Sequence, residues 1–508
     1  MIMHALIEQI LHNCKRYGEK AAYQSLSGTI TYQQLATSAR RLAAKLDLVV
    51  PERSPVLVYG HKQPLMPVCF LACALSGRAY VPADDIIPPE RVQCMAKQAG
   101  VTLALAVSPL TLTGVSMLCC DEIMQVCYGT DWCVDTPVLG LQPQELFYIL
   151  FTSGSTGEPK GVRISYANAA AFTGQLCGIP GLWGGAGRVV LNQAAFSFDL
   201  SVADLYGALC TGATLFVLER HVMQDIELLF ERLATSGAHT AVMTPSFAEL
   251  CLCDSAFGSA LLPELRAILF CGEPLRPDTV RRLFERFGTL RVFNAYGPTE
   301  TTVAVTVCEI TPALAQQELL PVGSEIGGAA IYVVDDTCRL LPDGEKGQLL
   351  VTGSCVGAGY TGTNQGGFFE FLGQRAYLTG DYGYRYNKLL YVTGRADRQI
   401  KHRGYRIELQ DIEQNILRLT GVRTCAVIKV DGVREYLCAF ICPAQGADIT
   451  PQSVRSDLRG QLPAYMVPER VRIVQALPLT VNGKCDRLTL LQTEMGEVSI
   501  SKEDNRIG

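Results

Sequence analysis

Short apolar segments rich in β-branched and aromatic residues recur along most of the chain, and amphipathic segments with helical period alternate with them. Such apolar segments are typical of strands that are buried on both faces. They lie at residues 56–60, 188–196, 213–219, 239–246, 266–273 and 291–297. The helical pattern is clearest at residues 225–237 and 278–288. The alternation predicts an α/β fold in which helices flank the sheets.

The pattern changes near residue 395. Residues 394–419 are dense in charge, and two further strand-like segments follow at 424–430 and 435–441. A chain of 508 residues is also too long for one compact core. We therefore expect an N-terminal domain, residues 1–396, and a small α+β C-terminal domain, residues 397–508.

Composition narrows the possible partners. With 48% hydrophobic residues, 18% charged residues and a formal charge of -5, the chain has no basic excess for binding nucleic acid or anionic membranes. The apolar stretch 65–75 is far shorter than the ~20 residues of a membrane span, and the N-terminus does not resemble a secretory signal. The 20 cysteines form no C-x-x-C pair, so we assign them no metal or disulfide role. We expect a cytoplasmic protein without membrane insertion.

The segment FTSGSTGEPKGV, residues 151–162, concentrates hydroxyls, glycines and one lysine after an apolar run. Adjacent amides and hydroxyls can form a nest for a polyphosphate, and glycines let the backbone approach it. The spacing differs from a Walker loop, and the sequence predicts strand, loop and strand, then a helix from about Ser165. From composition alone, a flexible hairpin tip is slightly favoured. The candidate phosphate-binding residues are Thr152, Ser153, Gly154, Ser155, Thr156, Gly157 and Lys160.

This segment resembles the phosphate loop of the adenylate-forming superfamily, which includes acyl-CoA synthetases, luciferases and peptide-synthetase adenylation domains. Further matching motifs follow in the family's order at residues 196–209, 294–303, 377–383, 394–409, 462–470 and 477–487. Segments 59–64, 191–206, 244–249 and 269–275 are most similar to ligases that load D-alanine onto a carrier protein. The resemblance implies a large multi-layer N-terminal domain and a small C-terminal domain that rotates about a hinge.

The resemblance also implies that ATP and Mg²⁺ are bound. Besides the loop, the ATP-binding residues would be Asn294, Ala295, Tyr296, Gly297, Thr299, Asp381, Arg395 and Lys484. Tyr296 would lie against the adenine, Asp381 would accept hydrogen bonds from the ribose, and Glu300 would bind Mg²⁺ as a hard oxygen ligand. Without the resemblance, Glu300 is a turn acid, and Asp381 and Arg395 form a surface ion pair.

The small domain would carry three further functional residues. Lys484 follows an Asn-Gly turn, where a lysine is most often merely exposed. The resemblance makes it the catalytic lysine, acting with Thr152 and Glu300. Asp397 would be the hinge, and Gly404 would line a tunnel for a phosphopantetheine arm.

Asp199 lies between Phe198 and Leu200 in an apolar stretch. A desolvated carboxylate requires a cationic partner, although Asp199 is also a good N-cap for a following helix. Similarity to amino-acid-activating enzymes assigns it to the substrate's ammonium group. Cys271 by itself is most simply a core residue. The resemblance places it in a small substrate pocket whose other walls would be Leu200, Ala203, Met243, Ala295 and Val303.

Together these expectations describe a monomeric, AMP-forming ligase. It would activate a small amino acid, D-alanine by resemblance, and transfer it to the phosphopantetheine thiol of a separate carrier protein. L-Alanine, serine or glycine in a stand-alone peptide-synthetase adenylation enzyme is the nearest alternative. An acid:CoA ligase and a non-catalytic nucleotide-binding scaffold are more distant alternatives.

Overall fold

The computed structural model describes residues 5–50, 52–129, 140–154, 157–362, 366–395, 399–431, 435–478 and 485–503. The chain forms two compact units. The first comprises residues 1–85, 95–151 and 161–397, and the second comprises residues 86–94, 152–160 and 398–508. Along the described part of the chain, none of the helices has the length and apolar character needed to cross a membrane.

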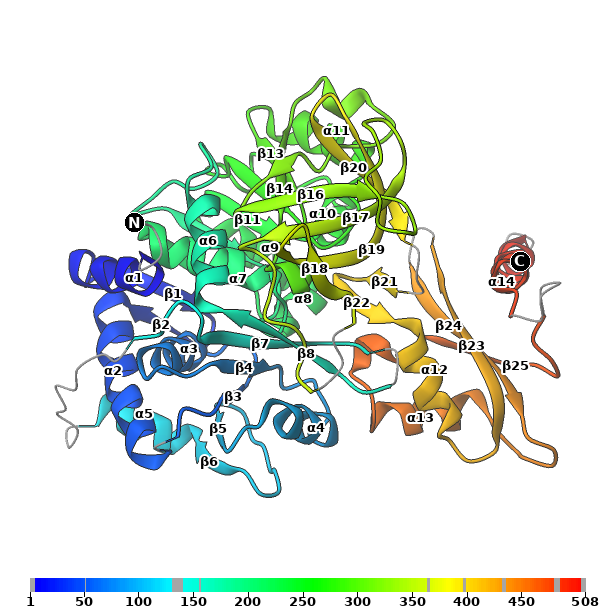
Figure 1. Ribbon diagram of the computed structural model, residues 1–508, viewed down its shortest axis with the longest axis horizontal. Helices are drawn as coiled ribbons and strands as arrows, with labels where there is room; N and C mark the ends of the chain where they lie inside the picture. The colour runs from blue at the N-terminus through cyan, green and yellow to red at the C-terminus, as the bar shows by residue number, and fades with distance from the viewer. Residues whose placement is uncertain are drawn as a thin grey trace. The chain divides into compact units, whose positions relative to one another are not determined.

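A nine-stranded sheet is the centre of the first unit (Figure 1). Five successive pairings, from β1 through β10, β9, β11 and β12 to β13, are parallel, and the three remaining pairings at the edges are antiparallel. In spatial order the strands are β15 (Ser324–Glu325), β14 (Thr306–Ile310), β13 (Arg291–Tyr296), β12 (Ala267–Phe270), β11 (Thr240–Met243), β9 (Val189–Asn192), β10 (Thr214–Val217), β1 (Ala21–Ser25) and β2 (Gly28–Thr31).

Two more sheets complete this unit. The six-stranded sheet runs β6 (Ser116–Cys119), β5 (Leu103–Ala106), β3 (Val56–Tyr59), β4 (Tyr80–Ala83), β7 (Leu146–Thr152) and β8 (Lys160–Ser165). The five-stranded sheet is antiparallel and contains β16 (Ala329–Val334), β17 (Gly347–Gly353), β19 (Gln374–Tyr386), β18 (Phe368–Phe371) and β20 (Leu389–Arg395).

Helices cover both faces of the nine-stranded sheet. One face shares a core cluster with the six-stranded sheet and with α1 (Ala5–Arg16), α2 (Tyr32–Val49), α3 (Leu65–Leu75), α5 (Cys120–Tyr128), α6 (Tyr166–Cys177) and α7 (Leu200–Thr211). The other face packs against α8 (Arg220–Gln224), α9 (Ile226–Thr235), α10 (Pro245–Leu252) and α11 (Pro277–Phe287). Burial on both faces explains why the central strands lack polar alternation. The multi-layer α/β prediction is confirmed, and α9 and α11 are the two helices that the periodicity predicted.

The second unit is a small α+β unit. It contains the hairpin β21 (Gln399–His402) and β22 (Tyr405–Glu408) and a three-stranded sheet of β23 (Val422–Val430), β24 (Tyr436–Pro443) and β25 (Arg470–Ile473). Its helices are α12 (Leu409–Leu417), α13 (Pro451–Arg459) and α14 (Arg487–Glu503). The helix α4 (Pro89–Ala99) begins in segment 86–94, which groups with this unit.

Candidate active site

The carboxyl ends of four adjacent parallel strands of the first unit, β9, β11, β12 and β13, lie at the same end of the nine-stranded sheet. We call this end the carboxyl edge. In α/β proteins, ligands bind beyond the carboxyl ends of such strands. Met243 and Asn192 are the last residues of β11 and β9, and Cys271 and Gly297 follow β12 and β13 directly. The topology of the sheet therefore places the predicted site residues that end or follow β12 and β13 at this edge.

Asp199 precedes the first residue of α7, but its side chain makes no capping hydrogen bond. Instead its Oδ2 accepts a hydrogen bond from Thr299 Oγ1 at 2.6 Å. Thr299 begins the 3₁₀ helix η1 (Thr299–Thr301) immediately after β13. The helix-cap alternative is therefore wrong, and the carboxylate is oriented by a residue of the loop that follows β13.

Small and apolar residues surround this edge. Leu200, Ala203, Cys271, Ala295 and Val303 are all buried and belong to the same core cluster. Cys271 Sγ lies 3.9 Å from the carbonyl oxygen of Val303. Met243 belongs to the cluster on the opposite face of the sheet, so the structure does not bring it together with the other five.

The backbone of this edge is strained at Val303. Thr302 and Val303 have φ values of 64° and 68°, which branched residues rarely adopt. Thr302 Oγ1 is tied to the carbonyl oxygen of Cys355 at 2.7 Å, which helps to hold this conformation. At Gly297, a Cβ atom would lie 2.6 Å from Ala304 Cα, so only glycine fits beside this loop.

The predicted nucleotide-binding residues Tyr296, Asp381 and Arg395 form one connected group. Tyr296 OH donates to Asp381 Oδ2 at 2.7 Å, and Arg395 Nη1 lies 2.6 Å from Asp381 Oδ1. Burial, together with the Asp381 charge, raises the pKa of Tyr296 well above its ordinary value, so it remains a donor. Each carboxylate oxygen can accept a second hydrogen bond, as binding to a ribose would require. Asn294 is buried, and its amide donates to the carbonyl oxygen of Pro321 at 2.9 Å.

Glu300 is 2% exposed and lies in η1 beside Thr299. Its Oε1 accepts a hydrogen bond from Tyr360 OH at 2.7 Å, and Tyr360 OH lies 3.1 Å from Tyr377 OH. Burial is the main cause that raises the pKa of Tyr360 above its ordinary value, and the charge of Glu300 adds to this effect. A carboxylate oriented in this way is a suitable hard ligand for Mg²⁺.

The phosphate loop connects β7 to β8, which confirms the predicted order of strand, loop and strand. A Cβ atom on Gly154 would lie 2.1 Å from the carbonyl oxygen of Glu158, and Gly157 has a φ of 83°. Ser153 Oγ donates to the carbonyl oxygen of Arg406 at 3.0 Å and accepts from Glu408 N–H at 2.8 Å, within the second unit. In this conformation, its hydroxyl binds the backbone of β22. Thr152 Oγ1 lies 3.5 Å from the carbonyl oxygen of Lys160.

Four predicted functional residues lie outside the described residues: Ser155, Thr156, Asp397 and Lys484. Gly404 is described, and it forms the turn between β21 and β22 with a φ of 83°.

The sequence profile of the AMP-binding enzyme family matches residues 10–361, and that of the AMP-binding enzyme C-terminal domain matches residues 411–484. The chain belongs to the AMP-binding enzyme family. A D-alanine–D-alanyl carrier protein ligase of Bacillus licheniformis is 40% identical over 96% of this chain and 98% of the relative. A Bacillus cereus relative of the same name is 38% identical over 96% of this chain and 99% of the relative. The chain is accordingly an AMP-forming ligase.

Solved structures agree with this assignment. A nonribosomal-peptide-synthetase protein containing adenylation and PCP domains is 26% identical and aligns with a TM-score of 0.81 over 96% of this chain and 84% of that chain. The Vibrio cholerae adenylation domain AlmE, solved with glycyl-adenosine-5′-phosphate, is 23% identical and has a TM-score of 0.81 over 96% and 97% of the two chains. The AlmE likeness supports the fold alone.

The sequence did not single out Tyr360 or the bond from Thr299 to Asp199 in this AMP-binding enzyme. Tyr360 follows Gly359 in a glycine-rich stretch, and its partner Glu300 is 60 residues away. Only an alignment of family members, or the three-dimensional structure itself, could have shown that these two residues are in contact. Thr299 was expected among the ATP-binding residues, and its hydroxyl also orients the carboxylate of Asp199.

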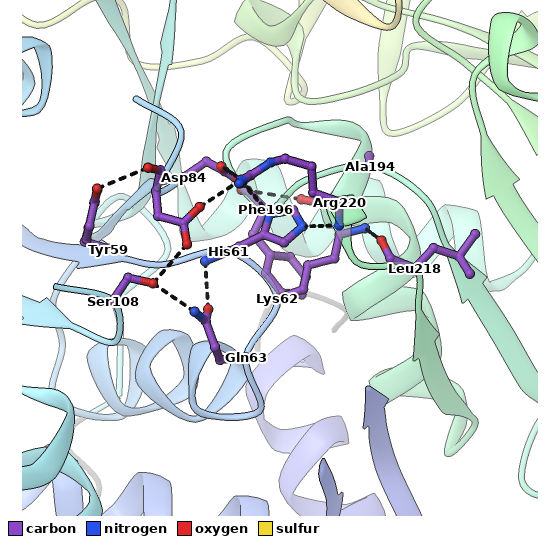
Figure 2. Close-up of polar contacts among 12 residues, drawn as sticks. Tyr59, His61, Lys62, Gln63, Asp84, Ser108, Ala194, Phe196, Leu218 and Arg220 are labelled. Carbon is purple, nitrogen blue, oxygen red and sulfur yellow. Dashed lines mark hydrogen bonds and ion pairs between the residues drawn. The ribbon is translucent and has the colours of Figure 1, made fainter. Parts of the chain in front are cut away.

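His61 lies in the loop after β3 and is not among the proposed catalytic residues. Its Nδ1 lies 2.6 Å from Asp84 Oδ2, and its Nε2 accepts a hydrogen bond from Arg220 N–H at 3.0 Å (Figure 2). Burial lowers its pKa, although Asp84 opposes the effect. Because both ring nitrogens are engaged, the imidazole is a structural link between the loops after β3, β4 and β10.

Proposed function

We propose that this enzyme activates D-alanine as D-alanyl-AMP and transfers it to the phosphopantetheine thiol of a separate carrier protein. The observation that carries the proposal is the oriented carboxylate of Asp199 beside small buried side chains. Such a carboxylate can bind the ammonium group of an amino acid, and a small pocket favours a small side chain. The names of the Bacillus relatives supply the choice of D-alanine.

In the first half-reaction, Asp199 holds the ammonium so that the substrate carboxylate attacks the α-phosphorus of ATP in line. The new P–O bond forms as the bond to pyrophosphate breaks. Tyr296, Asp381 and Arg395 position the nucleoside, the loop 152–160 contacts the phosphates, and Lys484 stabilises the developing charge. Glu300 would hold Mg²⁺, which supplies charge neutralisation at the phosphate oxygens.

In the second half-reaction, the carrier thiol attacks the aminoacyl carbonyl, a thioester forms and AMP leaves. We propose that the small domain turns about Asp397 between the two steps, which withdraws Lys484 and brings Gly404 to the thiol arm. We propose that the protein acts as a monomer.

Amino-acid-dependent pyrophosphate exchange tests the proposal. D-Alanine, L-alanine, glycine, serine and proline are compared in parallel at equal ATP and Mg²⁺. We expect D-alanine to give the highest kcat/KM. Preference for L-alanine, glycine or serine would favour a stand-alone adenylation enzyme with another small substrate, and preference for proline would refute the small pocket.

A further inference from the structure

The hairpin of β21 and β22 turns through only two residues, Arg403 and Gly404, because His402 pairs with Tyr405. Both turn residues have positive φ, 51° for Arg403 and 83° for Gly404. Two-residue hairpin turns of this type require positive φ at both positions. Glycine adopts it without cost, but arginine does not. The conformation of Arg403 therefore needs support from the surrounding structure.

Two glutamates supply that support within the second unit. The Arg403 N–H donates to Glu435 Oε1 at 2.8 Å, and Arg403 Nη2 donates to Glu469 Oε1 at 2.6 Å. Glu435 lies directly before β24 and Glu469 directly before β25. Glu469 Oε2 also accepts from Leu437 N–H at 2.9 Å. The hairpin tip is thus tied to the three-stranded sheet.

His402 lies between the same two glutamates, with its side chain 1% exposed. Its Nδ1 lies 3.1 Å from Glu435 Oε1, and its Nε2 lies 3.7 Å from Glu469 Oε1. Burial by itself lowers the pKa of His402, but the two glutamates outweigh burial and raise the pKa above its ordinary value. Burial would likewise raise the pKa of each glutamate, whereas the contacts with His402 and the other nearby donors lower it to about 2.

The remaining charged groups around His402 nearly balance. Lys429 lies 2.5 Å from Glu435 Oε2 and 3.2 Å from Asp431 Oδ1, and it also donates to the carbonyl oxygen of Lys401 at 2.9 Å. With an imidazolium at residue 402, three cations face three carboxylates, including Asp431. Deprotonation of His402 leaves an excess of negative charge, so that the two glutamates would repel each other more strongly across the neutral imidazole.

We propose that His402 is a positioning residue for thioester transfer. Its imidazolium forms ion pairs with both Glu435 and Glu469, an arrangement that we call the clasp, and so fixes the turn at Arg403 and Gly404. The inference rests on the proposed function, in which the thiol arm passes Gly404. When the imidazole loses its proton, the clasp weakens and the turn moves away from the geometry that admits the thiol. Adenylation does not require this turn and stays unchanged.

The variant His402→Gln removes the charge and keeps a side chain of similar size. D-Alanine-dependent pyrophosphate exchange reports adenylation. Transfer is measured with the phosphopantetheinylated D-alanyl carrier protein of Bacillus licheniformis and, separately, with free pantetheine. At about pH 6, where an imidazole of raised pKa is charged, we expect exchange to be unchanged and transfer to the carrier to slow about tenfold.

The dependence of the transfer rate on pH tests the direction of the effect. A raised pKa in the folded protein means that the clasp is complete below about pH 6.5 and is lost as pH rises through the folded value. The ratio of the wild-type transfer rate to the variant transfer rate should therefore fall toward one as the pH rises. Taking this ratio cancels the effect of thiol ionisation, because that effect is common to both proteins. A flat ratio, or equal losses of exchange and transfer, would overturn the proposal. His12→Gln, at an exposed histidine of α1, is the matched control and should change neither rate.

A second measurement does not depend on catalysis. The chain has six histidines, and ¹³C-histidine NMR of wild type and His402→Gln assigns the signal of residue 402. We expect it to titrate above about 6.5, and a value at or below that overturns the clasp. If the wild type exchanged pyrophosphate with none of the amino acids, the proposed function would fail while this titration still decided the state of His402.

Discussion

In the proposed function, recognition of the substrate's amino group depends on Asp199. Asp199→Asn keeps an oxygen to accept the hydrogen bond from Thr299 but removes the charge that an ammonium group requires. We expect kcat/KM for D-alanine to fall about 100-fold, or ~3 kcal/mol, in pyrophosphate exchange. The unfolding midpoint in urea should be unchanged, because Asp199 does not cap α7.

Asp225→Asn is the matched control, since Asp225 occupies the same position before α9 but does cap its helix, through Glu227 N–H and Leu228 N–H. Asparagine is an equally good cap, so activity and stability should both be retained. Loss of less than twofold in Asp199→Asn would show that the substrate amine binds elsewhere.

A local sequence pattern can reveal some of the site residues but not their partners. Asp199, Glu300 and Asp381 were predicted because a carboxylate in an apolar or turn motif is conspicuous and the motifs resemble a family. The partners of these carboxylates were not predicted. Thr299 is 100 residues from Asp199 and Tyr360 is 60 residues from Glu300, and no spacing along the chain encodes those contacts.

At the scale of elements, Lys62 joins two sheets. It lies in the loop after β3 of the six-stranded sheet. Its Nζ donates to the carbonyl oxygen of Leu218 at 2.7 Å, beyond β10 of the nine-stranded sheet (Figure 2). It also donates to the carbonyl oxygen of Gln193 at 2.9 Å, beyond β9. It is 1% exposed. Burial lowers its pKa to about 7. Its hydrogen bonds therefore hold the ends of strands from both sheets together.

Lys62→Met keeps the length of the side chain but leaves these two buried carbonyl oxygens without their donor. We expect the free energy of unfolding to fall by about 3 kcal/mol, measured by urea denaturation. Lys97→Met, at an exposed position of α4, is the control and should change stability little. A variant at residue 62 as stable as the wild type would show that the two sheets are held together without this lysine.

The types of element were predictable, and their order in the sheets was not. Buried strands and the amphipathic helices α9 and α11 follow from periodicity, which is local. The position of β10 between β9 and β1 depends on pairings between residues almost 200 positions apart, for example Tyr23 with Leu215. Ser153 illustrates the same limit at the site, because its hydroxyl binds the backbone at Arg406 and Glu408.

In the proposed mechanism, the small domain of the whole enzyme takes a different position in each of the two half-reactions. Lys484→Ala should therefore lower D-alanine-dependent pyrophosphate exchange about 100-fold, through loss of charge stabilisation in the adenylation step. Transfer to the carrier from supplied D-alanyl-AMP should be retained in single-turnover measurements. Full exchange in this variant would contradict the role of the lysine, and equal loss of both steps would contradict the separation of the placements.

We propose that the enzyme selects its acid substrate through an ammonium group bound by Asp199. The most direct measurement compares D-alanine with propionate, which has the same carbon skeleton without the amine, in pyrophosphate exchange by the wild-type enzyme. We expect kcat/KM for D-alanine to be about a thousandfold higher or more, because propionate offers the Asp199 carboxylate no ammonium group. Comparable values for the two acids would contradict the proposal and would favour an acid:CoA ligase.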